Sequence, residues 1–246
     1  MIAVGISDRG KVRETNEDRY LIYHDGPICL FAVADGMGGH AGGEVASTLA
    51  LETVKTYLVQ NGTSLLEKID AGRNMTSLLE EMLLQANKKV LDTASVDTEL
   101  VGMGTTLTML LAAKDHFWLG HIGDSRAYLI NREGIFHLTE DHTLVTQLMR
   151  CGQISEEESN GHPQRHFLTR ALGTDEDSVF DIIPQSFWPG DVVLLCTDGL
   201  HGFIENNEIR DVVLGGGEPE NVLERLVRLA NERGGKDNIT AVLVTF

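Results

Sequence analysis

The chain has 246 residues, enough for one large domain or two small ones around a substantial buried core. Its formal net charge of −17 at pH 7 argues against a nucleic-acid or anionic-membrane partner, because either would repel it. No run approaches the roughly 18 apolar residues of a membrane span, and the N-terminus lacks the basic and apolar regions of a signal peptide. We therefore expect a cytoplasmic protein with reduced cysteines.

Two pairs of helices and a series of short strands are predicted along the chain. Apolar residues recur with helical spacing at 44–59, 77–94, 206–214 and 219–233. After an N-terminal strand and the apolar run at 29–34, further β-rich segments lie at 105–112, 117–122, 127–130, 180–183, 191–197 and 239–246. Tight polar turns between these segments predict antiparallel pairing, and the order fits a layered sheet sandwich with helices outside.

Residues 141–173 differ from the rest of the chain. They combine one short helical pattern with an acidic loop that contains Gly and Asn. We interpret this segment as an inserted flap subdomain, and mobile loops near a site often carry specificity.

Carboxylates stand at the ends of four apolar strands. Asp35 follows CLFAVA, Asp124 follows FWLGHIG, Asp198 follows VVLLCT, and Asp237 precedes ITAVLVTF. An Asp-Gly pair alone is most often a turn. These four instead end continuous apolar runs that are expected to be central strands. If the four ends converge, the carboxylates would repel one another and raise each other's pKa, so a cation is needed between them.

The candidate ligands are oxygen atoms, which favour a hard cation such as Mg²⁺ or Mn²⁺ over zinc. Gly36 has no side chain, so its carbonyl could approach an ion that Asp35 binds. Two such ions about 3.5–4 Å apart could hold a bridging hydroxide in line with a phosphate. Upstream, Arg13, Glu17 and Asp18 form either a solvated salt-bridge cluster or a phosphoryl-binding arginine beside further metal-shell carboxylates.

Two other phosphate-binding motifs compete with this interpretation. Residues 38–43 have the outline of a P-loop, but Glu44 occupies the position of the phosphate-binding lysine and would repel the ligand. Residues 36–41 match G-x-G-x-x-A of the dinucleotide fingerprint, but Asp35 would abut the pyrophosphate. Both motifs are weaker than the carboxylate set.

With these residues in place, the sequence resembles the metal-dependent serine/threonine protein phosphatases of the PPM family (type 2C), in their bacterial form. The resemblance covers nearly the whole chain. It rests on seven motifs in order: RETNED (13–18), VADGMGGHAGGEVAS (33–47), GTTL (104–107), HIGDSRAY (121–128), HPQRHFLTRALG (162–173), LCTDGL (195–200) and GGKDNITAVLV (234–244).

The resemblance implies an α+β fold, a four-layer α/β/β/α sandwich of two antiparallel sheets flanked by helix pairs. It implies one catalytic domain over residues 1–246, with the flap at 141–173. It also implies two Mn²⁺ or Mg²⁺ ions per chain between the sheets and a third, weaker site.

Residue by residue, the resemblance makes Asp35 the bridging metal ligand and the Gly36 carbonyl a ligand of one ion. Asp198 and Asp237 would bind the other ion, and Asp124 with Asp198 the third. By the same resemblance, Arg13 would bind the substrate phosphate and Glu17 would belong to the metal shell. Asp18 would hold metal-bound waters together with Glu17, and it is a predicted catalytic residue.

The sequence departs from the family at the proton donor. Well-studied eukaryotic members have His directly after Asp-Gly, where this chain has Met37. His40 is the candidate catalytic acid, although a His flanked by glycines could instead hydrogen-bond its own loop. His201 follows DGL where Ser or Thr is commoner, and no role follows from the sequence.

The predicted reaction is hydrolysis of phosphoserine and phosphothreonine in proteins by metal-bound hydroxide, in a single step without a phosphoenzyme. No cysteine begins a C-x₅-R phosphate loop, which agrees with this prediction. The alternative is an inactive phosphoprotein- or metal-binding regulatory module, but such a module is expected to lack a metal carboxylate. The expected partners are phosphorylated substrates of serine/threonine kinases, and a monomer is expected.

Overall fold

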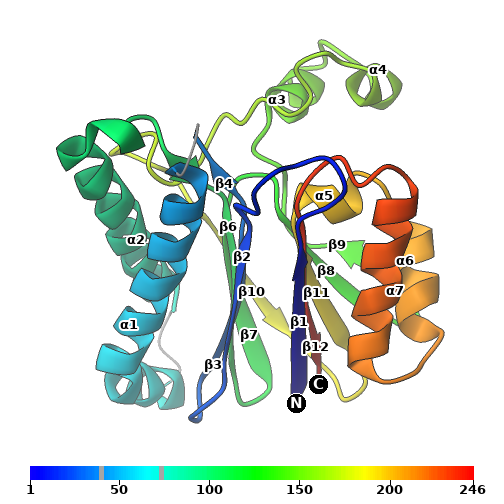
Figure 1. The fold of residues 1–246 in the computed structure, drawn as a ribbon. Coiled ribbons are helices and arrows are strands. Elements are labelled where there is room, and N and C mark those ends of the chain that lie inside the picture. The colour runs from blue at the N-terminus through cyan, green and yellow to red at the C-terminus, as the bar shows by residue number, and fades with distance from the viewer. Residues whose placement is uncertain (39–41, 72–74) are drawn as a thin grey trace.

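A computed structural model of the chain describes residues 1–38, 42–71 and 75–246. Two five-stranded antiparallel sheets form its centre (Figure 1). The first sheet contains, in spatial order, β1 (Ile2–Asp8), β12 (Ile239–Thr245), β11 (Val192–Cys196), β8 (Arg126–Asn131) and β9 (Gly134–His137). The second contains β10 (Asp181–Ser186), β7 (His116–Ile122), β6 (Leu107–Ala113), β3 (Cys29–Ala34) and β2 (Arg19–Tyr23). A short ribbon pairs β4 (Gly36–Met37) with β5 (Gly104–Thr105).

Helices cover the outer face of each sheet (Figure 1). The second sheet carries α1 (Gly42–Asp70) and α2 (Thr76–Val96), and the first carries α6 (Asn206–Leu214) and α7 (Pro219–Glu232). The short η1 (Thr98–Leu100) follows α2, and α5 (Asp198–His201) follows β11. Separate hydrophobic clusters fill the space between the sheets and beneath each helix pair. The predicted α+β fold with two antiparallel sheets and helices is confirmed. No described helix has the length and apolar character that crossing a bilayer requires.

Strand β3 consists of an uninterrupted apolar run because both faces of its sheet are covered. Successive side chains of a strand point to opposite faces of its sheet. Leu30, Ala32 and Ala34 therefore pack beneath the helices, whereas Phe31 and Val33 pack between the sheets. All six residues of the strand are buried, which is typical of a strand covered on both faces. Asp35 is the first polar residue that this strand can present at its end.

The main differences from prediction are the end of one long helix and two edge strands. Helix α1 continues to Asp70 rather than ending at residue 59. Gly62 weakens the helical pattern there, but Leu65 is only 1% exposed in the core and stabilises the extra turns through packing. Strands β2 and β9 were not predicted, because each is short and lies at a sheet edge with few buried residues.

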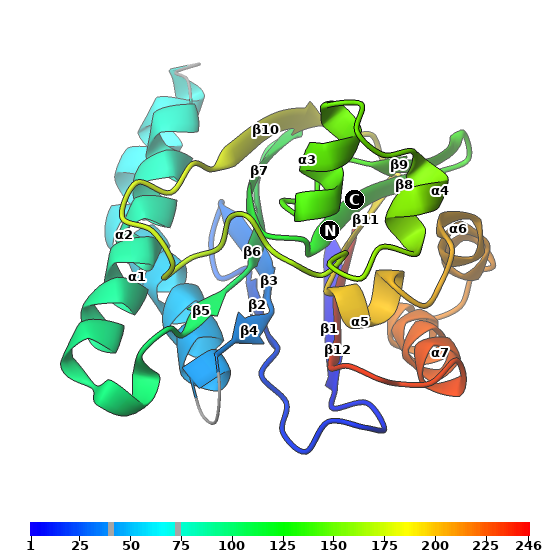
Figure 2. The same ribbon diagram turned by 90° about the horizontal axis from the view of Figure 1, so that it is seen from above.

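The segment predicted as a flap projects above the sheets as α3 (Leu144–Arg150) and α4 (Glu156–Asn160) (Figure 1), and Figure 2 shows the two helices from above. Two helices replace the single one predicted, because Ser155 and Glu158 form a capping box that starts the second. The two ends of the segment are joined by backbone hydrogen bonds, including Leu144 N–H to the Phe167 carbonyl at 2.9 Å.

Candidate metal centre

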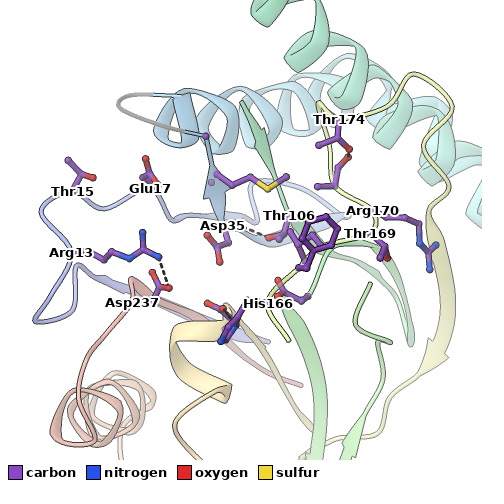
Figure 3. Close-up of a pocket in the computed structure, with 18 of the residues that line it drawn as sticks. Arg13, Thr15, Glu17, Asp35, Thr106, His166, Thr169, Arg170, Thr174 and Asp237 are labelled. Carbon is purple, nitrogen blue, oxygen red and sulfur yellow. Dashed lines mark hydrogen bonds and ion pairs between the residues drawn. The ribbon is translucent and has the colours of Figure 1, made fainter. Parts of the chain in front are cut away.

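The four strand-end carboxylates meet at one end of the sandwich, where they line a cavity of about 1170 Å³. Asp35 arrives from the second sheet at the end of β3 and Asp124 just after β7. Asp198 and Asp237 arrive from the first sheet, beside β11 and β12. Figure 3 shows Asp35 and Asp237 on facing sides of this cavity. The sandwich topology thus brings together groups that are far apart in the sequence.

The upstream motif supplies the other side of the cavity. Glu17 and the Gly36 backbone line it, and so does Arg13, whose Nη2 donates to Asp237 Oδ2 at 2.8 Å. The Arg13 side chain is 51% exposed, so it is paired with a predicted ligand yet open to a bound phosphate. The hydrogen bond to Asp237 raises the pKa of Arg13, which keeps it cationic.

Asp18 lies behind the cavity wall rather than on it. Its side chain is buried, and Thr197 Oγ1 donates to Oδ2 at 2.8 Å while Oδ1 has no hydrogen-bond partner among the described residues. Burial, together with the charges of Asp198 and Asp237, raises the pKa of Asp18 to about 7. His40, the predicted catalytic acid, lies outside the described residues.

The cluster carries more negative charge than the protein itself compensates. Burial and the neighbouring carboxylates raise the pKa of Asp35 well above its ordinary range, and burial with Asp198 does the same for Asp124. Burial also acts on Asp198, but the contact with His166 and the positive groups nearby outweigh it and lower the pKa of Asp198. The carboxylates therefore compete for protons unless a cation is supplied.

The donor set fits a hard divalent cation. The Oδ1 atoms of Asp18 and Asp198 are buried without hydrogen-bond partners in the described chain, which is costly unless something else binds them. Within the same described ranges, no three His, Cys, Asp or Glu side chains are already arranged around one ion position. Mg²⁺ and Mn²⁺ suit such a site, because backbone carbonyls and retained waters complete their coordination.

Gly36 is required by its surroundings. A Cβ atom there would collide with the backbone carbonyl of Gly43 at the start of α1 and lie 2.8 Å from the Glu17 carbonyl oxygen. The glycine thus allows three backbone segments to approach behind the cavity. The sequence suggested only that it frees a carbonyl for the metal.

We expect Gly36→Ala to lower the free energy of unfolding by about 3 kcal/mol, because the groups that must move are backbone rather than side chain. Gly62→Ala is the matched control, since nothing lies within 4 Å of its Cβ position in α1. That control should stabilise by about 0.5–1 kcal/mol. Urea unfolding of both variants measures the difference. A Gly36→Ala protein as stable as wild type would contradict the packing argument.

Two histidines near the cluster were not assigned from the sequence. His166 Nδ1 lies 3.6 Å from Asp198 Oδ2, and its side chain is 63% exposed at the cavity wall (Figure 3). His201 Nε2 donates to the Asp124 carbonyl at 2.9 Å, and burial, together with Arg126, lowers the pKa of His201 to about 4. The HPQRHFLTRALG motif was the available signal for His166, whereas His201 becomes interpretable only when the fold places it beneath Asp124.

The flap borders the centre directly. A second cavity of about 610 Å³ lies between the flap and α5, and it shares Asp124, His166, Asp198 and Asp237 with the first. Flap residues Thr143, Val145 and Asn160 line this second cavity but not the first. The carboxylate cluster is therefore reached from two sides.

Comparison with known proteins agrees with this geometry. The sequence profile of the family described as Protein phosphatase 2C matches residues 9–244. Serine/threonine phosphatase stp of Listeria welshimeri is 35% identical over 97% of this chain and 93% of its own length. Protein phosphatase PhpP of Streptococcus pneumoniae is 35% identical over 98% of this chain and 96% of its own.

A solved structure of the catalytic domain of serine threonine protein phosphatase PstP, in complex with two manganese ions, has a TM-score of 0.80 to this chain. It is 35% identical and covers 98% of this chain and 96% of that one. The chain therefore belongs to the protein phosphatase 2C family, and the predicted family resemblance is confirmed.

Proposed function

We propose that the chain hydrolyses phosphoserine and phosphothreonine in proteins, with the carboxylate cavity as its metal centre. The observation that carries this proposal is the meeting of Asp35, Asp124, Asp198 and Asp237 beside Arg13 in one cavity, with buried carboxylate oxygens that lack hydrogen-bond partners among the described residues. The names of the relatives, which are serine/threonine and protein phosphatases, support the substrate class.

Each residue has a proposed role in holding the ions. Asp35 would bind both ions of a pair, the Gly36 carbonyl one of them, and Asp198 with Asp237 the other. Asp124 would share a third, weaker ion with Asp198. Glu17 would orient waters from the cavity wall and Asp18 from behind it, which suits the burial of Asp18 and its oxygen without a hydrogen-bond partner in the described chain.

When bound, the ions would lower the pKa of a water held between them and supply hydroxide for a one-step displacement at phosphorus, without a phosphoenzyme. The chain's own contribution is to orient the phosphate and protonate the leaving oxygen. Arg13 would hold the phosphoryl oxygens with its planar guanidinium. His40 is the proposed proton donor, while His166 is the imidazole that lines the cavity in the described part of the chain.

The substrates would be cytoplasmic phosphoproteins modified by serine/threonine kinases. We propose that residues 1–246 act as one monomeric catalytic domain, with the flap at its entrance. The three cysteines, Cys29, Cys151 and Cys196, are free, as suits a reducing compartment.

Hydrolysis of a phosphothreonine peptide, with Mn²⁺ or Mg²⁺ restored after chelation, tests the proposal. Activity that disappears with the chelator and returns with the metal is the expected result. Tight metal binding without turnover would favour the inactive regulatory module. That alternative is opposed by the presence of Asp35, Asp198 and Asp237, since a decayed site is expected to have lost one of them.

Arg13→Ala should lower kcat/KM for a phosphopeptide by about 10- to 100-fold, which corresponds to one lost charge-assisted pair of hydrogen bonds. Arg13→Lys keeps the charge but lacks the planar guanidinium, so its kcat/KM should lie between those of wild type and Arg13→Ala. Arg132→Ala, in the exposed turn between β8 and β9, serves as the control. Steady-state kinetics at saturating Mn²⁺ measure the effect, and an unchanged kcat/KM would remove Arg13 from substrate binding.

A further inference from the structure

A buried histidine on the flap, His142, binds the turn that carries Asp124 at Gly123. Gly123 N–H donates to His142 Nδ1 at 3.1 Å, and His142 N–H donates to the Gly123 carbonyl at 2.8 Å. Gly123 has φ +108, and a Cβ there would lie 2.5 Å from the Thr106 side chain. The turn is thus packed against Thr106 and bonded twice to His142.

The contacts of His142 determine which of its ring nitrogens carries the proton. A backbone N–H can only donate, so Nδ1 must accept and the proton of the neutral ring stays on Nε2. Nε2–H then donates to Asp181 Oδ2 at 3.2 Å, and Arg170 Nη1 lies 3.1 Å from Asp181 Oδ1. The His142 side chain is completely buried, and burial together with Arg170 lowers the pKa of His142, which favours this neutral form.

The same residue also joins the two ends of the flap. The His142 carbonyl accepts from Thr169 N–H at 2.8 Å, and the next residue, Thr143, forms a β-bridge with Leu168. Arg170, which binds Asp181, lies on the returning segment. His142 thus contacts the Asp124 turn through its ring and its backbone N–H, and the flap return through its backbone carbonyl.

We propose that His142 is a positioning residue that fixes the Asp124 turn relative to the flap and thereby sets the affinity of the ion site to which Asp124 contributes. The inference rests on the proposed metal centre, but not on turnover. Loss of the Nδ1 acceptor would leave the buried Gly123 N–H unpaired, so the turn would keep only the bond from the His142 backbone N–H and be held less tightly. Loss of the Nε2 donor would loosen only the contact with Asp181.

Two amide substitutions separate these effects. The Asn amide oxygen lies as many bonds from the backbone as Nδ1, so His142→Asn can retain the bond from Gly123. The Gln amide nitrogen corresponds in the same way to Nε2, so His142→Gln can retain the bond to Asp181 and loses the one from Gly123. His116→Gln, at the opposite end of β7 from Asp124, is the control.

Isothermal titration with Mn²⁺ is the direct measurement. We expect His142→Gln to raise the dissociation constant of the weakest Mn²⁺ site at least about tenfold, whereas His142→Asn and His116→Gln remain within about twofold of wild type. Turnover of His142→Gln at limiting Mn²⁺ should fall and recover at saturating Mn²⁺. Equal losses in the Asn and Gln variants, or wild-type binding by His142→Gln, would overturn the proposal.

If His142→Gln does not fold, hydrogen exchange in the wild-type protein tests the proposal instead. Saturation with Mg²⁺ should slow amide hydrogen exchange at Gly123 and Thr169 together, while exchange at Leu138, which bonds to Ala127 in the first sheet, stays unchanged. Unchanged exchange at Gly123 would overturn the inference. Wild-type protein that binds ions but hydrolyses no phosphopeptide would instead refute the proposed function and leave the binding test intact.

Discussion

Asp198→Ala should lower Mn²⁺-dependent kcat/KM by about 10³-fold or more. Replacing an outer partner of a metal ligand typically costs 10- to 100-fold, and a direct ligand is expected to cost more. Asp198 lines both cavities and its carboxylate interacts with those of Asp35 and Asp124, so it has a central position in the cluster. Under the proposed roles, it contributes to two ion sites.

The fold should survive this substitution. Asp198 Oδ1 has no hydrogen-bond partner in the described chain, and its charge raises the pKa values of Asp18, Asp35 and Asp124. Removing that charge relieves repulsion on these three carboxylates but also removes the favourable contacts that lower the pKa of Asp198, so Asp198→Ala should stay folded with a stability close to that of wild type without metal. Asp211→Ala, on the exposed face of α6, is the control for loss of an acidic side chain. Near-normal turnover by Asp198→Ala at limiting metal would show that the assignment is wrong.

Patterns within single segments predicted much of the fold. Helix α7 begins at Pro219 and carries its buried residues on one face, as its start signal and periodicity indicated. Asp35 was recognisable because the six residues before it are apolar on both faces of the strand. Such signals are local, so they are present in the sequence before any tertiary contact is known.

Other parts of the site depend on contacts between distant segments. His142 and Gly123 are 19 residues apart, and the role of the histidine follows only from the register that brings the flap ends together. The close packing around Gly36 likewise requires that α1 begin beside the Glu17 segment. The metal cluster itself was predicted only as a conditional statement, namely that four strand ends converge.

Metal should make the stability of the protein much more sensitive to acid. Burial lowers the pKa of His121 to about 3 and those of His137 and His201 to about 4. The unfolded state therefore binds protons near the ordinary histidine pKa of about 6.5, whereas the folded state does not. The stability from these groups is complete above that pH and is lost as the pH falls. Between about pH 6.5 and 5.5 the loss is about 1 kcal/mol per histidine.

In the metal-free protein the carboxylates act in the opposite direction. The pKa of Asp18 is raised to about 7 in the folded state, so as the pH falls the folded protein takes up this proton at a higher pH than the unfolded chain does. This uptake adds about 1 kcal/mol to the free energy of unfolding over the same interval. The raised pKa values of Asp35 and Asp124 add to this compensation. Bound cations would keep these groups ionised, so the contribution of the histidines would no longer be offset.

Urea unfolding at several pH values, with excess Mn²⁺ or with chelator, measures the contrast. The metal-loaded protein should lose about 3 kcal/mol between about pH 6.5 and 5.5, and the metal-free protein much less. Proton competition for the ligands steepens the first curve further. Without metal, Asp18→Asn should lose about 1 kcal/mol more stability than wild type over this pH interval, because the Asn side chain cannot take up the compensating proton. Equal slopes with and without metal would mean that the carboxylates and the ions do not share one site.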